Sequence, residues 1–121
     1  MKTSTANLVT NNDLPYGPFK SVHVGSRTHL LPADIMYISA DINYSMIHLT
    51  NGRSILVSTT LGKIEKRLFE FKNLVRVHKS FVVNTAYLQK IYSYQVELKN
   101  GVFCKVSRRK MKNLLEQSSN S

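Results

Sequence analysis

One stretch, residues 75–84, constrains the fold of this chain more than any other. It reads Val-Arg-Val-His-Lys-Ser-Phe-Val-Val-Asn, with two β-branched runs, Val75–Val77 and Phe81–Val83, on either side of a polar centre. Apolar runs of this kind favour buried strands, whereas the polar side chains between them have to stay hydrated. The pattern therefore predicts a pair of strands that holds His78-Lys79-Ser80 at an exposed corner, a common way of mounting functional groups.

Asn-Gly pairs, the strongest short-range hairpin signal, occur at residues 51–52 and 100–101. Strands are predicted on both sides of each pair, at 46–50 and 53–58, and at 95–99 and 102–106. Alternation in the first hairpin places Ile47, Leu49, Ile55 and Val57 on one face. Further strands are predicted at 19–24, 28–31, 34–38 and 88–92, with a polar loop at 39–44.

Two segments have helical patterns. Residues 60–71 carry Leu61, Ile64, Leu68 and Phe71 at the spacing of a buried stripe. Ser58, Thr59 or Thr60 is expected to cap the start of this helix. Residues 108–116 follow Ser107, a suitable N-cap, and Met111, Leu114 and Leu115 form the expected buried side. Asn84 is expected to cap a short helical turn at 85–88. The sequence as a whole predicts a mainly β fold of small antiparallel sheets with one or two short helices.

The positive charge is concentrated in the second half of the chain. The net charge is +10, and residues 71–115 carry ten lysines and arginines against the single acid Glu97, while residues 1–70 carry seven against five. Such a distribution favours a surface that binds a polyanion. The alternative is a basic surface that serves only solubility.

The sequence contains little that indicates an enzyme. The single cysteine, Cys104, falls on an inward strand register, where cysteine usually acts as a small buried hydrophobe. The four histidines lack metal-ligand spacing, and no glycine-rich phosphate loop is present. We therefore expect no catalytic residue, no metal and no cofactor.

Three predicted connections carry donors suited to nucleic acid. Arginine and lysine can donate to guanine, asparagine can pair with adenine, and serine hydroxyls and a helix N-terminus suit phosphate oxygens. The exposed corner formed by His78, Lys79 and Ser80 is called the tip below. The candidate residues are Asn43 and Tyr44 in the loop at 41–45, His78, Lys79 and Ser80 at the tip, and Lys105, Ser107, Arg108, Arg109 and Lys110 around the start of the last helix.

Each candidate has a simpler interpretation. His78 could pack against the scaffold and only shape the tip, and the lysine and the arginines could be ordinary surface charges. However, Arg108 and Arg109 at a helix N-terminus oppose the helix dipole, which favours an external anion as their partner. Tyr37, Tyr87, Tyr92 and Tyr94 are expected to be buried or half-buried.

The order of these motifs resembles the LytTR-type DNA-binding domain. The family signature, roughly Arg-x-His-basic-Ser-aromatic/aliphatic-Val-Asn, is matched by residues 76–84. An isoleucine follows at Ile91, then Asn100-Gly101, then a Val-Ser-Arg element at residues 106–109. The resemblance covers about residues 19–116, and it implies a LytTR-like β-β-β sandwich made of small antiparallel sheets.

The resemblance also implies a function. Domains of this type insert loops into two neighbouring major grooves of double-stranded DNA and contact the minor groove between them. The base-reading positions correspond to Asn43 or a neighbour, to Lys79 beside His78, and to Arg108 or Arg109. We therefore expect a sequence-specific transcription regulator of the bacterial cytoplasm, which is either a stand-alone protein or the output part of a two-component response regulator. Two copies are expected to be able to pair on repeated half-sites.

The domain organisation expected is a disordered lead at 1–18, the DNA-binding domain at 19–116 and a loose tail at 117–121. No run of about 18 apolar residues occurs, so no membrane-spanning helix is expected. Two other functions remain open: a binder of RNA or single strands, which needs aromatic side chains exposed on a sheet face, and a basic protein-interaction module.

Overall fold

The computed structural model describes residues 20–120, with side chains described as far as residue 116. This part of the chain forms ten strands, which pair only in antiparallel fashion. The strands are β1 (Val22–Gly25), β2 (Thr28–Leu30), β3 (Ile35–Asp41), β4 (Tyr44–Leu49), β5 (Ser54–Val57), β6 (Leu74–His78), β7 (Phe81–Asn84), β8 (Leu88–Tyr92), β9 (Gln95–Leu98) and β10 (Phe103–Lys105).

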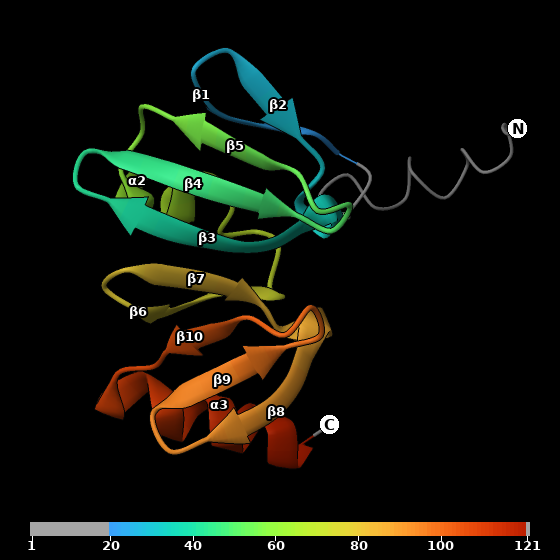
Figure 1. The fold of residues 1–121 in the computed structure, drawn as a ribbon, viewed down its shortest axis with the longest axis vertical. Coiled ribbons are helices and arrows are strands. Elements are labelled where there is room, and N and C mark those ends of the chain that lie inside the picture. Colours follow the sequence, from blue (N-terminus) through green and yellow to red (C-terminus); the bar gives the residue numbers. More distant parts are fainter. Residues whose placement is uncertain (1–19, 121) are drawn as a thin grey trace, which may run out of the picture.

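The strands form three sheets that follow one another along the long axis of the molecule (Figure 1). A hairpin of β1 and β2 lies at one end, a five-stranded sheet of order β5-β4-β3-β7-β6 occupies the middle, and a three-stranded sheet of order β10-β9-β8 lies at the other end. The helices are α2 (Leu61–Arg67) and α3 (Arg108–Asn120), with short 3-10 turns η1 (Pro32–Asp34) and η2 (Thr85–Tyr87). The predicted mainly β fold of small antiparallel sheets is confirmed.

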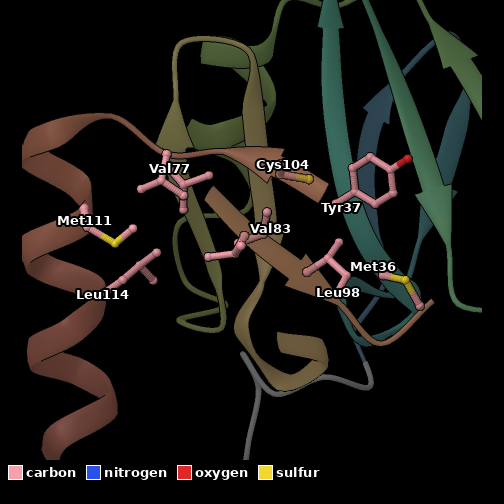
Figure 2. Close-up of a cluster of buried hydrophobic side chains, with 10 residues drawn as sticks. Met36, Tyr37, Val77, Val83, Leu98, Cys104, Met111 and Leu114 are labelled. Carbon is pink, nitrogen blue, oxygen red and sulfur yellow. The ribbon is translucent and has the colours of Figure 1, made fainter. Parts of the chain in front are cut away.

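Two hydrophobic clusters hold these layers together. One cluster joins α2 and β1 to a face of the five-stranded sheet through residues such as Val24, Ile38, Ile47 and Ile64. The other joins the five-stranded sheet, the three-stranded sheet and α3, and Figure 2 shows its side chains. The second cluster contains Met36, Tyr37, Val77, Val83, Val96, Leu98, Cys104, Val106, Met111 and Leu114.

Both Asn-Gly hairpins form where predicted, since β4 pairs with β5 and β9 pairs with β10 around these turns. Asn51 and Asn100 each accept a hydrogen bond from the backbone two residues later, at 2.9 Å and 3.1 Å respectively. The predicted caps are also confirmed. The Thr60 side chain accepts from the Lys63 N–H at 3.4 Å, and that of Ser107 accepts from the Lys110 N–H at 3.3 Å.

Several predicted bounds were wrong. The polar loop expected at 39–44 is only the two-residue turn 42–43, because β3 and β4 continue to Asp41 and Tyr44. The helix predicted at 60–71 ends at Arg67, since Leu68 has left helical geometry with φ −103° and ψ 8°. The last helix continues to Asn120 instead of ending at Glu116. The expected lead, 1–18, and Phe19 at the predicted start of the first strand lie outside the described residues.

One side-chain prediction on the last helix was also wrong. Met111 and Leu114 are buried in the second cluster, but Leu115 is 49% exposed. Leu114 and Leu115 lie on either side of Met111, about 100° apart around the helix, and the sheets cover only the side that carries Leu114. No helix within residues 20–120 combines the length and the apolar character needed to cross a membrane.

A buried asparagine links the middle sheet to the segment that follows it. Asn84 is only 1% exposed, and its side-chain amide donates to the Ile35 carbonyl at 2.8 Å. Its side-chain oxygen accepts from the Ala86 N–H at 3.0 Å and caps η2, as predicted. One side chain thus joins the end of β7 to the start of β3, across 49 residues of sequence.

We predict that Asn84→Ala lowers the free energy of unfolding by about 1–3 kcal/mol, because it leaves the buried Ile35 carbonyl without its partner and removes the cap on the Ala86 N–H. Urea unfolding followed by circular dichroism measures the change. Asn51→Ala is the matched control, since Asn51 makes its bond in an exposed turn, and its effect should stay within about 0.5 kcal/mol. Equal losses in the two variants would contradict this role of Asn84.

Candidate nucleic-acid interface

The tip between β6 and β7 is held by the guanidinium group of Arg76. Its Nε donates to the His78 carbonyl and its Nη2 to the Lys79 carbonyl, both at 2.8 Å. The remaining arm, Nη1, donates to Glu65 Oε1 on α2 at 2.8 Å. The planar fork of an arginine suits three such acceptors at once. The role of Arg76 was not predicted from the sequence, where this residue appears only as part of a signature, although a charged residue inside a β-branched run is a signal for such a role.

His78 shapes the same tip through its ring. The Ser80 N–H donates to His78 Nδ1 at 3.1 Å, so Nδ1 is unprotonated in this arrangement. Burial lowers the pKa of His78 below its ordinary value, and the positive charges of Lys105, Lys79 and Arg76 lower it further. The ring is therefore neutral at pH 7. The interpretation that His78 shapes the tip is supported, and its contact with DNA stays a prediction.

The three predicted connections lie along one edge of the molecule, at the left of Figure 1. The Ala40 N–H donates to the Ser80 carbonyl at 2.9 Å, which places the end of β3 and the turn after it next to the tip. The Ser107 N–H donates to the Val77 carbonyl at 2.8 Å, which places the start of α3 on the other side of the tip. Segments far apart in sequence thus meet, with the tip in the middle.

A cationic hollow of about 370 Å³ lies between the tip and the start of α3. Its cations come from both sides, since Arg76 and Lys79 belong to the hairpin and Arg109 and Lys110 to the helix. Converging cations of this kind create a field that attracts anions. The residues that line the hollow are Arg76, His78, Lys79, Ser107, Arg109 and Lys110.

The two arginines at the start of α3 occupy different surroundings. Arg109 lines the hollow, whereas the guanidinium of Arg108 lies 5.7 Å from the centre of the Tyr94 ring, in the turn between β8 and β9. This arrangement is a cation–π contact. The sequence left open which arginine faces a ligand, and the structure places Arg109 beside Lys79.

The other predicted site residues lie along the same edge, outside the lining of this hollow. Asn43 and Tyr44 are exposed at the turn after β3, and Ser80 is half-buried at the tip. Lys105 is exposed on β10, close enough to His78 for its charge to lower the pKa of that ring. All ten predicted residues thus lie at or near one edge, although Arg108 faces Tyr94 rather than the hollow.

The described residues show no sign of a metal or thiol site. Within this part of the chain, no three His, Cys, Asp or Glu side chains are gathered to hold an ion. Cys104 is fully buried in the second cluster, and burial raises its pKa to about 11. A thiol that stays protonated in this way is a poor nucleophile.

The expectation for the tyrosines was only partly right. Tyr37 is buried and Tyr87 is half-buried, but Tyr92 and Tyr94 are exposed, Tyr94 by 50%. Phe103 is exposed as well, and its ring centre lies 5.6 Å from that of Tyr92. The side chains of Tyr92 and Phe103 lie on the outer face of the three-stranded sheet. Val96 and Cys104 are buried on its opposite face.

We predict that the protein becomes less stable as the pH falls below about 6.5, the ordinary histidine pKa of the unfolded chain. Burial lowers the pKa of His78 and also that of His48, whose ring nitrogens lie within hydrogen-bonding distance of Ser39 and Ser54. Because the unfolded chain binds more protons between the two pKa values, the stabilisation is complete above about pH 6.5 and is lost as the pH falls through the folded-state values.

Urea unfolding between pH 5 and 8 tests this prediction. His78→Asn places an amide oxygen near the Nδ1 position, so it should retain most of the stability at pH 7.5 and have a weaker pH dependence. His29→Asn, at an exposed position, is the control and should keep the wild-type profile. An unchanged profile in His78→Asn would contradict the assignment.

Comparison with known proteins identifies the family of this domain. The model of the LytTr DNA-binding domain family matches residues 26–119. The transcriptional regulatory protein LytR of Staphylococcus aureus (strain bovine RF122 / ET3-1) is 30% identical over 118 residues, which cover 90% of this chain and 46% of that protein. The sensory transduction protein LytT of Bacillus subtilis (strain 168) is 37% identical over 86 residues, which cover 67% of this chain and 35% of that protein.

The chain thus spans less than half the length of these relatives. Among solved structures, the LytTr DNA-binding domain of a Bacillus cereus protein superposes with a TM-score of 0.62, and the match covers 80% of this chain and 93% of that one. Its 16% sequence identity shows a shared fold. The family match extends over most of the chain, from the first hairpin to the last helix. This chain belongs to the LytTR family of DNA-binding domains.

Proposed function

We propose that this domain binds double-stranded DNA in a sequence-specific manner and serves a bacterial transcription regulator in the cytoplasm. The observation that carries the proposal is the cationic hollow between the β6–β7 tip and the start of α3. Residues 19–116 would form the DNA-binding domain. It would act either as a stand-alone regulator or as the output part of a response regulator, and two copies would be able to pair on repeated half-sites.

The order of the connections along the edge suits a loop-based contact with a duplex. The turn after β3 lies on one side of the tip and the start of α3 on the other. We infer that the two outer connections enter neighbouring major grooves while the tip, with Lys79, faces the minor groove between them. Asn43 and Tyr44 would then meet base edges in one major groove, and Arg109 would meet them in the next.

Different groups would contact the sugar-phosphate backbone and position the domain on the DNA. Lys110 lines the hollow, and Ser107 caps the first turn of α3. The N–H groups at the start of this helix are suited to phosphate oxygens. Contacts with phosphate set the register of a protein on DNA, and contacts with bases select the sequence. Arg108 is the weaker candidate for base reading because it faces Tyr94.

We predict a steep dependence of duplex binding on salt. If about five phosphates are neutralised, the logarithm of the affinity should fall with the logarithm of the salt concentration with a slope of about −4 to −5. Fluorescence anisotropy with a labelled duplex, selected from a random pool, measures the slope. A slope near zero, or no binding to any duplex at low salt, would contradict the proposal and favour a protein-interaction module.

We predict that Arg109→Ala costs about 1–3 kcal/mol on the selected duplex and much less on unrelated duplexes, because it removes a base contact. Lys110→Ala should instead weaken binding to all duplexes alike and reduce the salt slope by about 1. Arg108→Ala, at the same helix start but directed at Tyr94, is the matched control and should relax sequence preference less than Arg109→Ala. Gel shifts on varied duplexes compare the three variants. Equal losses of affinity on every duplex in all three variants would contradict these roles.

A second candidate function has one observation in its favour. Tyr92 and Phe103 are exposed side by side on the three-stranded sheet, and Lys90 Nζ lies 5.2 Å from the centre of the Tyr92 ring. Exposed aromatic rings beside cations can stack unpaired bases. Competition between a duplex and each of its separated strands distinguishes the two functions, since a single-strand binder would prefer the strands and lose affinity in Phe103→Ala.

A further inference from the structure

The turn between β3 and β4 exposes an apolar side chain that the fold does not use. Ile42 is 88% exposed, more than any other large hydrophobic residue among the described part of the chain, where Phe69 follows at 66%. It belongs to neither hydrophobic cluster. Packing in the folded protein therefore does not explain why an isoleucine occupies this position.

The backbone conformation of Ile42 makes its presence harder to explain by stability. Its φ is +58°, in the left-handed region that β-branched residues rarely adopt. Tight two-residue connections between strands usually have glycine, asparagine or aspartate at such a position. The next residue is an asparagine, but the positive φ falls on the isoleucine. Strained residues of this kind tend to occur at functional sites.

The position of Ile42 brings it to the proposed DNA edge. It lies directly after Asp41, whose neighbour Ala40 is bonded to Ser80 of the tip. Ile42 therefore projects from the same edge as Lys79. Asp41 is exposed beside it, and a carboxylate repels phosphate groups. An apolar side chain next to an acid suits the base edges inside a groove better than the sugar-phosphate backbone.

We propose that Ile42 reads the 5-methyl group of a thymine in the major groove. Thymine is the base that presents an apolar group there, whereas cytosine presents an N4 amino donor at the neighbouring position. An isoleucine against the methyl group buries apolar surface, but against the amino group it leaves a donor without a partner. The inference rests on the proposed duplex binding and adds a specificity residue to it.

The test removes the methyl group from the DNA and the side chain from the protein. In the duplex selected by the wild-type protein, each thymine is replaced in turn by deoxyuridine, which pairs with adenine but lacks the methyl group. The wild-type affinity should fall by about fourfold at one position, the change expected for one buried methyl group. Ile42→Gly, which suits the positive φ, should bind the two duplexes equally, and Ile42→Val should retain part of the difference.

Two controls make the result specific. Phe69→Ala removes another highly exposed apolar side chain, between α2 and β6, and should keep the full methyl effect. Urea unfolding should show that Ile42→Gly is no less stable than the wild type. If deoxyuridine changes nothing at any position, or if Ile42→Gly keeps the fourfold difference, the inference fails although duplex binding stands. If the wild type selects no duplex at all, the proposed function fails and the inference fails with it.

Discussion

The fork of Arg76 is the interaction on which the arrangement of the functional edge depends. It donates to the carbonyls of His78 and Lys79 and connects both to Glu65 on α2. Without these donors, the tip would be held only by its own two-residue turn and by the hydrogen bond to the ring of His78. Because α2 is itself anchored in the first hydrophobic cluster through Leu61 and Ile64, the tip is connected to the core of the middle sheet by a chain of direct contacts.

The second cluster places the helix next to this tip. Met111 and Leu114 pack in the same cluster as Val77 on β6 (Figure 2), and Ser107 is bonded to the Val77 carbonyl. The cationic hollow therefore has walls from two elements that share one core, which favours a preorganised surface over one assembled on binding. The buried position of Cys104 in this cluster also explains why the only thiol of the chain is a packing residue.

Sequence patterns predicted the elements better than the directions of side chains. The Asn-Gly hairpins and the caps at Thr60, Asn84 and Ser107 depend on bonds between residues two or three positions apart, so local sequence is enough to locate them. The turn at Ile42 was missed because its residue types do not indicate a positive φ. The exposure of Tyr92 was missed because it depends on which face of β8 the rest of the molecule covers.

Periodicity, turn residues and ordered motifs are properties of neighbouring residues, so they were enough to predict the mainly β class, the family and the three connections that carry polar donors. The support of the tip by Arg76, the place of Arg109 with Lys79 in the lining of one hollow, and the contact of Arg108 with Tyr94 became known from the folded structure alone. These outcomes depend on contacts between segments that are distant in sequence. Such contacts are set by how two hydrophobic clusters pack the sheets and helices together, and local residue preferences do not specify that packing.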